Sequence, residues 1–217
     1  MNTTILFILS GTVAYLMGSI PFGFLIAKTQ GIDIRTVGSG NIGATNVFRS
    51  VSKKLGVITF ALDFLKGYCG AALLPLLANA IVSAPLEGLV ADILPVFCGA
   101  LTIVGHNWTC FLGFKGGKGI ATSAGMLMGL SPLGVSIALT VWFVIFVTTR
   151  YVSVASICAA LTMAVLVWPL HLKTHGVWFP TVLTLLAALA IWKHRSNIAR
   201  LRAGTESRIE FGKKGSS

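Results

Sequence analysis

The stretch ILFILSGTVAYLMGSIPFGFLIA, from Ile5 to Ala27, contains no charged residue. About 20 consecutive apolar residues in a helix cross the hydrocarbon core of a bilayer, so this stretch predicts a transmembrane helix. Gly18 and Pro21 interrupt it, which membrane helices tolerate where neighbouring helices satisfy the released backbone groups. Apolar segments recur as far as Trp192, so a signal peptide does not explain the first one.

Composition supports the same class of protein. The chain has 217 residues, of which 55% are hydrophobic and 11% are charged, and its mean hydropathy is +0.86. A soluble domain carries about 25% charged residues, so a chain this apolar cannot cover itself with polar surface. The sequence therefore predicts an all-α, polytopic membrane protein that forms a single domain over residues 1–217.

About seven transmembrane helices are expected from the apolar runs. These runs are Ile5–Ala27, Leu55–Val82, a third segment that ends near Phe111, Ile120–Leu130, Leu133–Thr149, Val152–Leu170 and Phe179–Trp192. Polar connections such as Ser83–Glu87 and His171–Trp178 separate them. The run Ile120–Leu130 is too short to span a bilayer comfortably.

Basic residues orient these helices. All of the 17 Lys and Arg residues fall on one set of loops and the tail from Lys193, except Lys173 and Lys66, which lies inside a span. Because cytoplasmic loops are enriched in Lys and Arg, the N-terminus is predicted outside and the C-terminus in the cytoplasm. The net charge of +11 flanks apolar runs, which favours membrane topology and anionic ligands over nucleic acid.

Three polar stretches fall on the predicted cytoplasmic face, and two of them are rich in glycine. They are Gly38–Asn46 followed by Arg49, then Gly113–Gly119, then His194–Asn197 followed by Arg200 and Arg202. Glycine lets backbone N–H groups approach an anion closely, and a helix N-terminus after such a loop attracts negative charge. These stretches favour one shared anionic site over flexible turns whose bases lie at the lipid headgroups.

The second stretch places its lysines and glycines directly before the helix expected from Ile120; they are Lys115, Gly116, Gly117, Lys118 and Gly119. This order predicts a phosphate-binding loop. It is not a Walker A motif, because Gly119 stands where Ser or Thr is required and Leu112 stands where the first glycine is required. ATP hydrolysis is therefore disfavoured.

The other two stretches supply hydrogen-bonding and proton-accepting groups. The first contains Gly38, Ser39, Gly40, Asn41, Thr45, Asn46 and Arg49, and arginine can bind phosphate with two parallel hydrogen bonds. The competing interpretation is that these residues cap a helix and that the Arg49 side chain only extends to the membrane interface. His194 is the candidate general base, with Asn197 one turn further on. His106 is the other candidate on this side, although interfacial histidines are commonly structural.

Charged and small polar residues inside the spans have two interpretations each. Asp63 and Lys66 are three residues apart, which suits mutual neutralisation on one helix, with an ion relay as the alternative. Ser153 and Ser156 either line the site or satisfy helix carbonyls. The cysteines form no CxxC motif and no metal-ligand cluster is evident, so neither a metal nor a cofactor is expected.

At these three stretches the sequence resembles the bacterial PlsY-type acyl-phosphate:glycerol-3-phosphate acyltransferases. The matching residues are Gly38–Asn46 with Arg49, Gly105-His106 with Phe114–Thr122, and His194–Leu201 with Gly204 and Glu206. The resemblance covers nearly the whole chain. It implies transfer of a fatty acyl group from acyl phosphate to the 1-hydroxyl of glycerol 3-phosphate, giving lysophosphatidic acid and inorganic phosphate, at the cytoplasmic face of the inner membrane.

The resemblance also implies partners and roles. Glycerol 3-phosphate, acyl phosphate and membrane lipids are the expected partners, without a cofactor or nucleic acid. Glycerol 3-phosphate is expected at Lys115–Gly119. Ser39, Arg49, Asn41 and Asn46 would bind phosphate and polarise the donor. His194 and Asn197 would orient the substrates, with either His194 or the donor's phosphate as the base. A transporter is the alternative class, disfavoured because only Asp63 and Lys66 lie within the spans.

Overall fold

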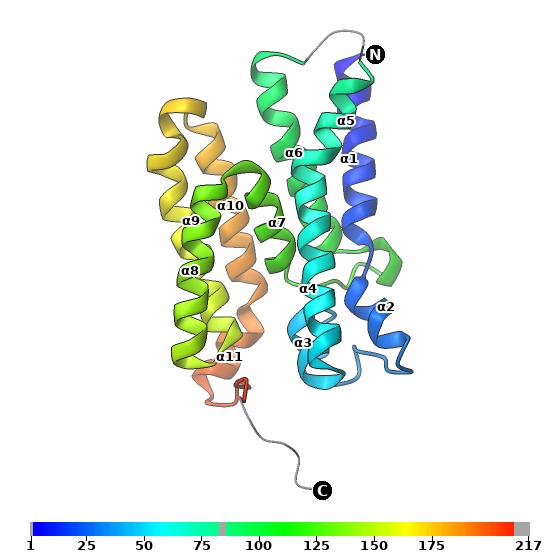
Figure 1. The fold of residues 1–217 in the computed structure, drawn as a ribbon, viewed down its shortest axis with the longest axis vertical. Helices are drawn as coiled ribbons and strands as arrows, with labels where there is room; N and C mark the ends of the chain where they lie inside the picture. The colour runs from blue at the N-terminus through cyan, green and yellow to red at the C-terminus, as the bar shows by residue number, and fades with distance from the viewer. Residues whose placement is uncertain (1, 83–85, 211–217) are drawn as a thin grey trace, which may run out of the picture. The chain divides into compact units, whose positions relative to one another are not determined.

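The computed structural model describes residues 2–82 and 86–210, and within these ranges the chain forms helices and loops without a β-strand (Figure 1). The chain divides into two compact units, Met1–Pro132 and Leu133–Ser217, which are described separately. The expected single domain over residues 1–217 stays a prediction. Part of the expected Ser83–Glu87 turn, residues 83–85, lies outside the described residues.

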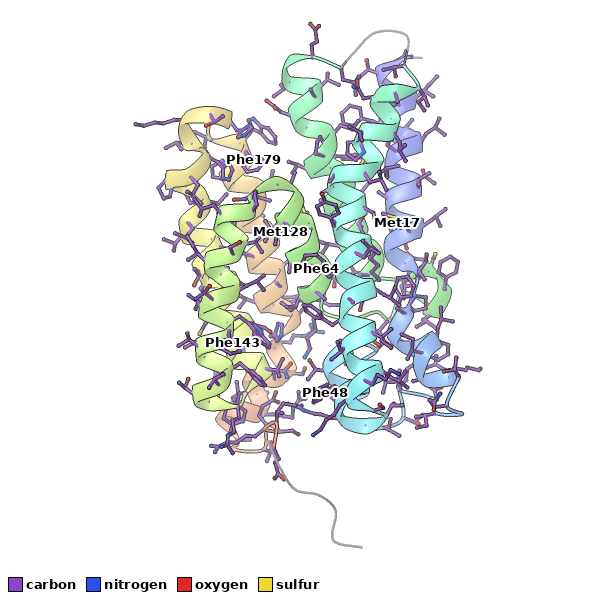
Figure 2. All side chains as sticks on the ribbon, in the orientation of Figure 1. Met17, Phe48, Phe64, Met128, Phe143 and Phe179 are labelled. Carbon is purple, nitrogen blue, oxygen red and sulfur yellow. The ribbon has the colours of Figure 1, made fainter. Side chains whose placement is uncertain are left out.

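Unit 1 contains the helices of the first half of the chain. They are α1 (Thr3–Ser19), α2 (Phe22–Lys28), α3 (Ala44–Ser50), α4 (Lys53–Tyr68), the π-helix η1 (Cys69–Leu73), α5 (Leu74–Ala80), α6 (Gly88–Asn107), the 3₁₀ turn η2 (Cys110–Leu112) and α7 (Ile120–Leu130). Helix α1 packs against α6, and α4 packs against both α3 and α7. Phe48 of α3 lies against α4 at Gly56, where a Cβ atom would collide with it (Figure 2).

Unit 2 is a group of three long helices and one short one. They are α8 (Pro132–Thr149), α9 (Val152–His175), α10 (Trp178–Lys193) and α11 (Arg195–Arg202). Helices α9 and α10 pack against each other. Many apolar side chains point outward, such as Phe143 on α8, which is 60% exposed (Figure 2). An outward-facing apolar surface of this kind suits lipid rather than water.

Five helical segments of the described residues are long and apolar enough to cross a membrane. They are Thr3–Lys28, Lys53–Ala80, Gly88–Leu112, Pro132–Thr149 and Val152–His175. The two remaining apolar runs are the shorter helices Ile120–Leu130 and Trp178–Lys193. The all-helical membrane class is therefore confirmed.

Boundaries differ from the expected ones at several positions. The polar stretch before Lys54 contains an unexpected helix, α3, and the second span contains the unexpected π-helix η1. Helix α6 ends at Asn107, but the apolar segment continues through η2 to Leu112, close to the expected end near Phe111. Helix α9 continues to His175, beyond the expected end at Leu170, because Pro169 is accommodated inside it. Hydropathy does not predict where these helices end, because polar residues can also continue the backbone hydrogen bonds of a helix.

The first span breaks where Pro21 predicts a break, between α1 and α2. Proline has no N–H, so the helix cannot continue its hydrogen-bond ladder there. The carbonyl of Ser19 instead accepts the Thr109 hydroxyl at 2.6 Å, and the carbonyl of Ile20 accepts Nζ of Lys66 at 2.9 Å. Side chains from two other segments thus satisfy the backbone of the broken helix.

Candidate active site

The first polar stretch is a loop held together by the side chain of Asn46. Its Oδ1 accepts the backbone N–H of Ser39 at 3.0 Å and the Ser50 hydroxyl at 3.2 Å. Its Nδ2 donates to the carbonyls of Ile34, Val37 and Asn41 at 3.0–3.1 Å. Asn46 is buried, and its hydrogen-bonding capacity is used within the protein, which favours a positioning role over direct phosphate contact.

The tip of this loop faces outward. Gly38 and Gly40 have φ of +58° and +67°, a region that favours glycine. A Cβ atom on Gly38 would also collide with the Asn46 and Ser50 side chains. Ser39, between these glycines, is exposed, and its Oγ has no hydrogen-bond partner among the described residues. Its hydroxyl is therefore available to a ligand.

Helix α3 carries the other polar residues of this stretch. Arg49 is exposed and Thr45 is half-buried. Asn41 precedes the helix and accepts the N–H of Gly43 at 2.8 Å, which fixes the turn into α3. The guanidinium and the two hydroxyls of Ser39 and Thr45 belong to one short, internally bonded segment.

The second polar stretch docks on the end of α6. The N–H of Gly117 donates to the carbonyl of His106 at 3.0 Å. A Cβ atom on Gly117 would collide with the His106 ring, lying 2.9 Å from Cε1 and closer still to Nε2. Gly119, with φ of +79°, is the N-cap of α7, and its absent Cβ would lie 2.8 Å from Oδ1 of Asn107. These glycines are therefore required by close packing.

The lysine side chains of this stretch are less buried than two of its glycines. Lys115 is exposed and Lys118 is half-buried, whereas Gly117 and Gly119 are buried. The stretch ends at the N-terminus of α7, where the first N–H groups of a helix have no partner within the helix. A loop that presents lysines beside such amides suits an anion.

The first two stretches lie in unit 1 and share a hydrophobic cluster. Ile42 of the first stretch is buried in it together with Ile34 and Val47 on either side of that stretch, and Leu112, which directly precedes the second stretch, packs against this cluster. The two expected phosphate-binding loops are therefore connected by packing. The third stretch belongs to unit 2, and one site shared by all three stretches stays a prediction.

Asp63 and Lys66 form the expected ion pair on α4. Nζ of Lys66 lies 2.8 Å from Oδ1 of Asp63, and both side chains are buried. A third residue, His106, was not expected at this pair; its Nδ1 lies 3.5 Å from the same Asp63 oxygen. The pair therefore contacts a histidine that also supports the glycine loop.

Two residues next to His106 were missed by the sequence analysis. Asn107 is buried against Gly119, and Thr109 bonds the broken end of α1. The only local signal was the sequence Asn107-Trp108-Thr109 beside the second motif. It carries no information on long-range partners.

In unit 2, His194 occupies the turn between α10 and α11. Its Nδ1 lies 2.8 Å from the carbonyl of Ala190. A carbonyl accepts only from a protonated nitrogen, so a neutral imidazole carries its proton on Nδ1 and its lone pair on Nε2. The ring is buried. In this arrangement Nε2 is the ring nitrogen of His194 that could accept a proton.

Asn197 is oriented by a carboxylate that the sequence analysis named only as part of a motif. Glu206 Oε1 accepts from Nδ2 of Asn197 and from the Ser153 hydroxyl, each at 2.7 Å, and Oε2 accepts from Nε of Arg200 at 2.7 Å. Burial raises the pKa of Glu206, but the hydrogen bonds from Asn197, Ser153 and Arg200 together lower it below its ordinary value of 4.5. Glu206 is therefore ionised at neutral pH.

The two serines of α9 have different partners. Ser153 donates to Glu206 as described, whereas Ser156 accepts Nε1–H of Trp142 at 3.1 Å. Ser153 is thus connected to Asn197 through one carboxylate. Ser156 joins two helices of unit 2. Among the described residues no group of three or more His, Cys, Asp or Glu side chains is placed to hold a metal ion.

Comparison with known proteins gives consistent matches along the chain. Residues 8–204 match the family model described as glycerol-3-phosphate acyltransferase. A glycerol-3-phosphate acyltransferase of Geotalea daltonii is 45% identical over 194 residues, which are 89% of this chain and 93% of the relative.

Solved structures agree with this match. A crystal structure of PlsY, an integral membrane glycerol 3-phosphate acyltransferase in its glycerol 3-phosphate form, has a TM-score of 0.80 and 40% identity, covering 94% of this chain and 96% of that one. Its lysophosphatidic acid form has a TM-score of 0.77 and 39% identity, covering 94% and 95%.

The helices and the matches together define an integral membrane enzyme of the acyltransferase class. More specifically, the chain belongs to the glycerol-3-phosphate acyltransferase family.

Proposed function

We propose that the protein transfers a fatty acyl group from acyl phosphate to the 1-hydroxyl of glycerol 3-phosphate, as the opening step of phospholipid synthesis. The hydroxyl oxygen attacks the acyl carbonyl carbon, the bond from that carbon to the phosphate oxygen breaks, and the hydroxyl proton passes to a base. The products are lysophosphatidic acid and inorganic phosphate. An acyl phosphate is already activated, so little acid–base assistance is needed.

One observation carries this proposal. The glycine and lysine loop Lys115–Gly119 is packed on the end of α6 by glycines that admit no side chain, directly before the N-terminus of α7. This arrangement suits a small dianionic substrate, because the loop offers backbone N–H groups in fixed positions and the two ammonium groups of its lysines. The loop belongs to a chain of the glycerol-3-phosphate acyltransferase family.

The remaining residues of unit 1 suit the donor. Ser39 presents a hydroxyl without a protein partner among the described residues, and Arg49 is an exposed guanidinium on the adjoining helix. Asn41 and Asn46 hydrogen-bond the segment around them, to which Gly38, Gly40 and Thr45 also belong. In this proposal Ser39 and Arg49 bind the donor's phosphate and polarise its carbonyl. An acyl-enzyme on Ser39 is disfavoured, because within residues 2–82 and 86–210 no carboxylate or histidine bonds its hydroxyl.

In unit 2, His194 and Asn197 are proposed to orient the substrates. The Nε2 lone pair of His194 suits acceptance of the hydroxyl proton, and the donor's own phosphate is the alternative base. Glu206 holds Asn197 through a bond of 2.7 Å. No metal or cofactor takes part in the proposed steps.

We further propose seven membrane-crossing segments, with the N-terminus outside, the C-terminus in the cytoplasm and the active site at the cytoplasmic face of the bacterial inner membrane. The distribution of Lys and Arg supports this orientation. Reporter fusions at both termini test it. Opposite sides are expected, and the same side for both would refute an odd number of crossings.

The catalytic test uses purified full-length protein in detergent. Radiolabelled glycerol 3-phosphate is supplied with palmitoyl phosphate and, in parallel, with palmitoyl-CoA. We expect lysophosphatidic acid from palmitoyl phosphate alone. Product from palmitoyl-CoA would refute the proposed donor, and no product from either donor with monodisperse protein would refute the proposed reaction.

A further inference from the structure

Three ionisable side chains meet inside unit 1, away from the exposed loops. Asp63 and Lys66 lie on α4 and His106 lies near the end of α6, with exposures of 2%, 4% and 5%. Ionisable groups within a membrane-spanning segment are costly and are retained for pairing or for function. Pairing explains Asp63 with Lys66, but it leaves the contact with His106 unexplained.

Lys66 has a structural task that needs no third partner. Its Nζ lies 2.8 Å from Oδ1 of Asp63 and donates to the carbonyl of Ile20 at 2.9 Å. It therefore both neutralises Asp63 and satisfies the backbone where Pro21 breaks the first span. Neutralisation of the two charges would require only that the carboxylate of Asp63 contact Lys66.

The carboxylate of Asp63 instead also faces the imidazole. Oδ1 lies 3.5 Å from Nδ1 of His106. At this distance the two groups make a close electrostatic contact rather than a hydrogen bond. In a buried setting such a contact favours the ring orientation in which Nδ1 faces the carboxylate. The orientation of the opposite ring edge, which carries Nε2, therefore depends on Asp63.

That opposite edge supports the glycine loop. A Cβ atom on Gly117 would collide with Nε2 of His106, and the backbone carbonyl of His106 accepts the N–H of Gly117 at 3.0 Å. The backbone of Gly117 is thus located by both the main chain and the ring of one residue. A rotation of that ring would displace the loop, because protein interiors have no free space to absorb it.

We propose that Asp63 is a positioning residue for the Lys115–Gly119 loop, acting through the imidazole of His106. The proposal rests on the proposed function, in which this loop binds glycerol 3-phosphate. It assigns to a buried carboxylate on α4 a contribution to substrate affinity rather than only to charge neutralisation.

Asp63→Asn is the direct test, because it keeps the shape of the side chain and removes its charge. The KM for glycerol 3-phosphate is expected to rise about 10-fold, with kcat and the KM for palmitoyl phosphate near their wild-type values. Combined with Gly117→Ala, the two effects are expected to be less than additive, because both displace the same loop through the same ring.

A second variant guards against loss of folding. Removing one member of a buried ion pair destabilises a protein more than replacing both by neutral residues. Asp63→Asn/Lys66→Met removes both charges, and the carbonyl of Ile20 keeps the N–H of Phe22 at 3.1 Å. The same rise in KM is expected. Thr59→Val is the matched control, since Thr59 is buried on the same helix and its hydroxyl donates to the carbonyl of Leu55 within that helix.

The outcomes separate this inference from the function on which it rests. If Gly117→Ala raises the KM for glycerol 3-phosphate but Asp63→Asn and the double variant do not, Asp63 serves neutralisation alone and the inference is wrong. Strictly additive effects would equally overturn it. If wild-type protein forms no lysophosphatidic acid, or Gly117→Ala leaves that KM unchanged, the loop assignment and the inference fall together.

Discussion

Adding a single methyl group to the second loop, as Gly117→Ala, perturbs the proposed phosphate site without changing any charge. The new Cβ atom would lie 2.9 Å from Cε1 and 3.0 Å from Cδ2 of His106, and closer still to Nε2. Ordinary contacts at Cβ are 3.4–4 Å. Either the imidazole or the loop must therefore move away.

The imidazole has little room to move. It is buried, and its Nδ1 faces Asp63. Lys115 and Lys118 are less buried than the ring, so most of the displacement falls on the backbone beside these lysines. A misplacement of about 1 Å in a binding constellation can cost about 100-fold. Because part of it is absorbed by the ring, we expect the KM for glycerol 3-phosphate to rise roughly 10- to 100-fold.

Initial rates of lysophosphatidic acid formation at saturating palmitoyl phosphate measure this effect. A loss of uniform binding raises KM and leaves kcat nearly unchanged. Gly129→Ala is the matched control, because Gly129 is a helical glycine of α7 whose Cβ would meet Ala72 Cβ at 3.3 Å, and alanine favours helix. An unchanged KM for Gly117→Ala, or an equal rise for Gly129→Ala, would refute the reasoning.

Two further predictions rest on hydrogen-bonded residues of the site, and a third concerns metal ions. Asn46→Ala removes the acceptor and donors that hold the first loop, so we expect a loss of about 2–3 kcal/mol in unfolding free energy, measured by thermal unfolding in detergent; an unchanged midpoint would contradict it. Because the pKa of Glu206 is lowered in the folded protein, its stabilisation is present above its unfolded pKa and is lost as pH falls through the lower folded value. The unfolding midpoint of wild type should therefore fall more steeply below pH 4.5 than that of Glu206→Gln, and parallel curves would count against this. Acyl transfer should be the same with and without EDTA, and loss of activity restored by magnesium would show that a metal takes part.

The sequence predicts the helical membrane class well because that class depends on composition averaged over long segments. A run such as Leu133–Thr149 is apolar at almost every position, and the helix observed there is Pro132–Thr149. The break at Pro21 is likewise predictable, because the missing N–H is a property of one residue. Helix α3 is not, because its seven residues carry no apolar period and depend on packing against α4.

The candidate site residues can be found from residue type, but their roles cannot. Asn41, Asn46 and Asn197 are alike in sequence, each an amide in a polar stretch. Asn46 bonds five groups of its own loop, whereas Asn197 bonds Glu206. The difference depends on contacts between residues far apart in the chain, such as Ser153 with Glu206. No local pattern encodes such contacts.

Several local irregularities of unit 1 instead explain one another. Pro21 breaks a membrane helix, and at the break the carbonyl of Ile20 accepts the N–H of Phe22 at 3.1 Å and the charged Nζ of Lys66 at 2.9 Å. That ammonium requires a buried counter-charge, which Asp63 provides. The carboxylate then faces His106, whose ring leaves room only for glycine at position 117. Each of these residues would be unfavourable in an isolated membrane helix, but each has a neighbouring residue in this group that offsets its cost. The broken first span and the glycine loop are therefore parts of one connected arrangement.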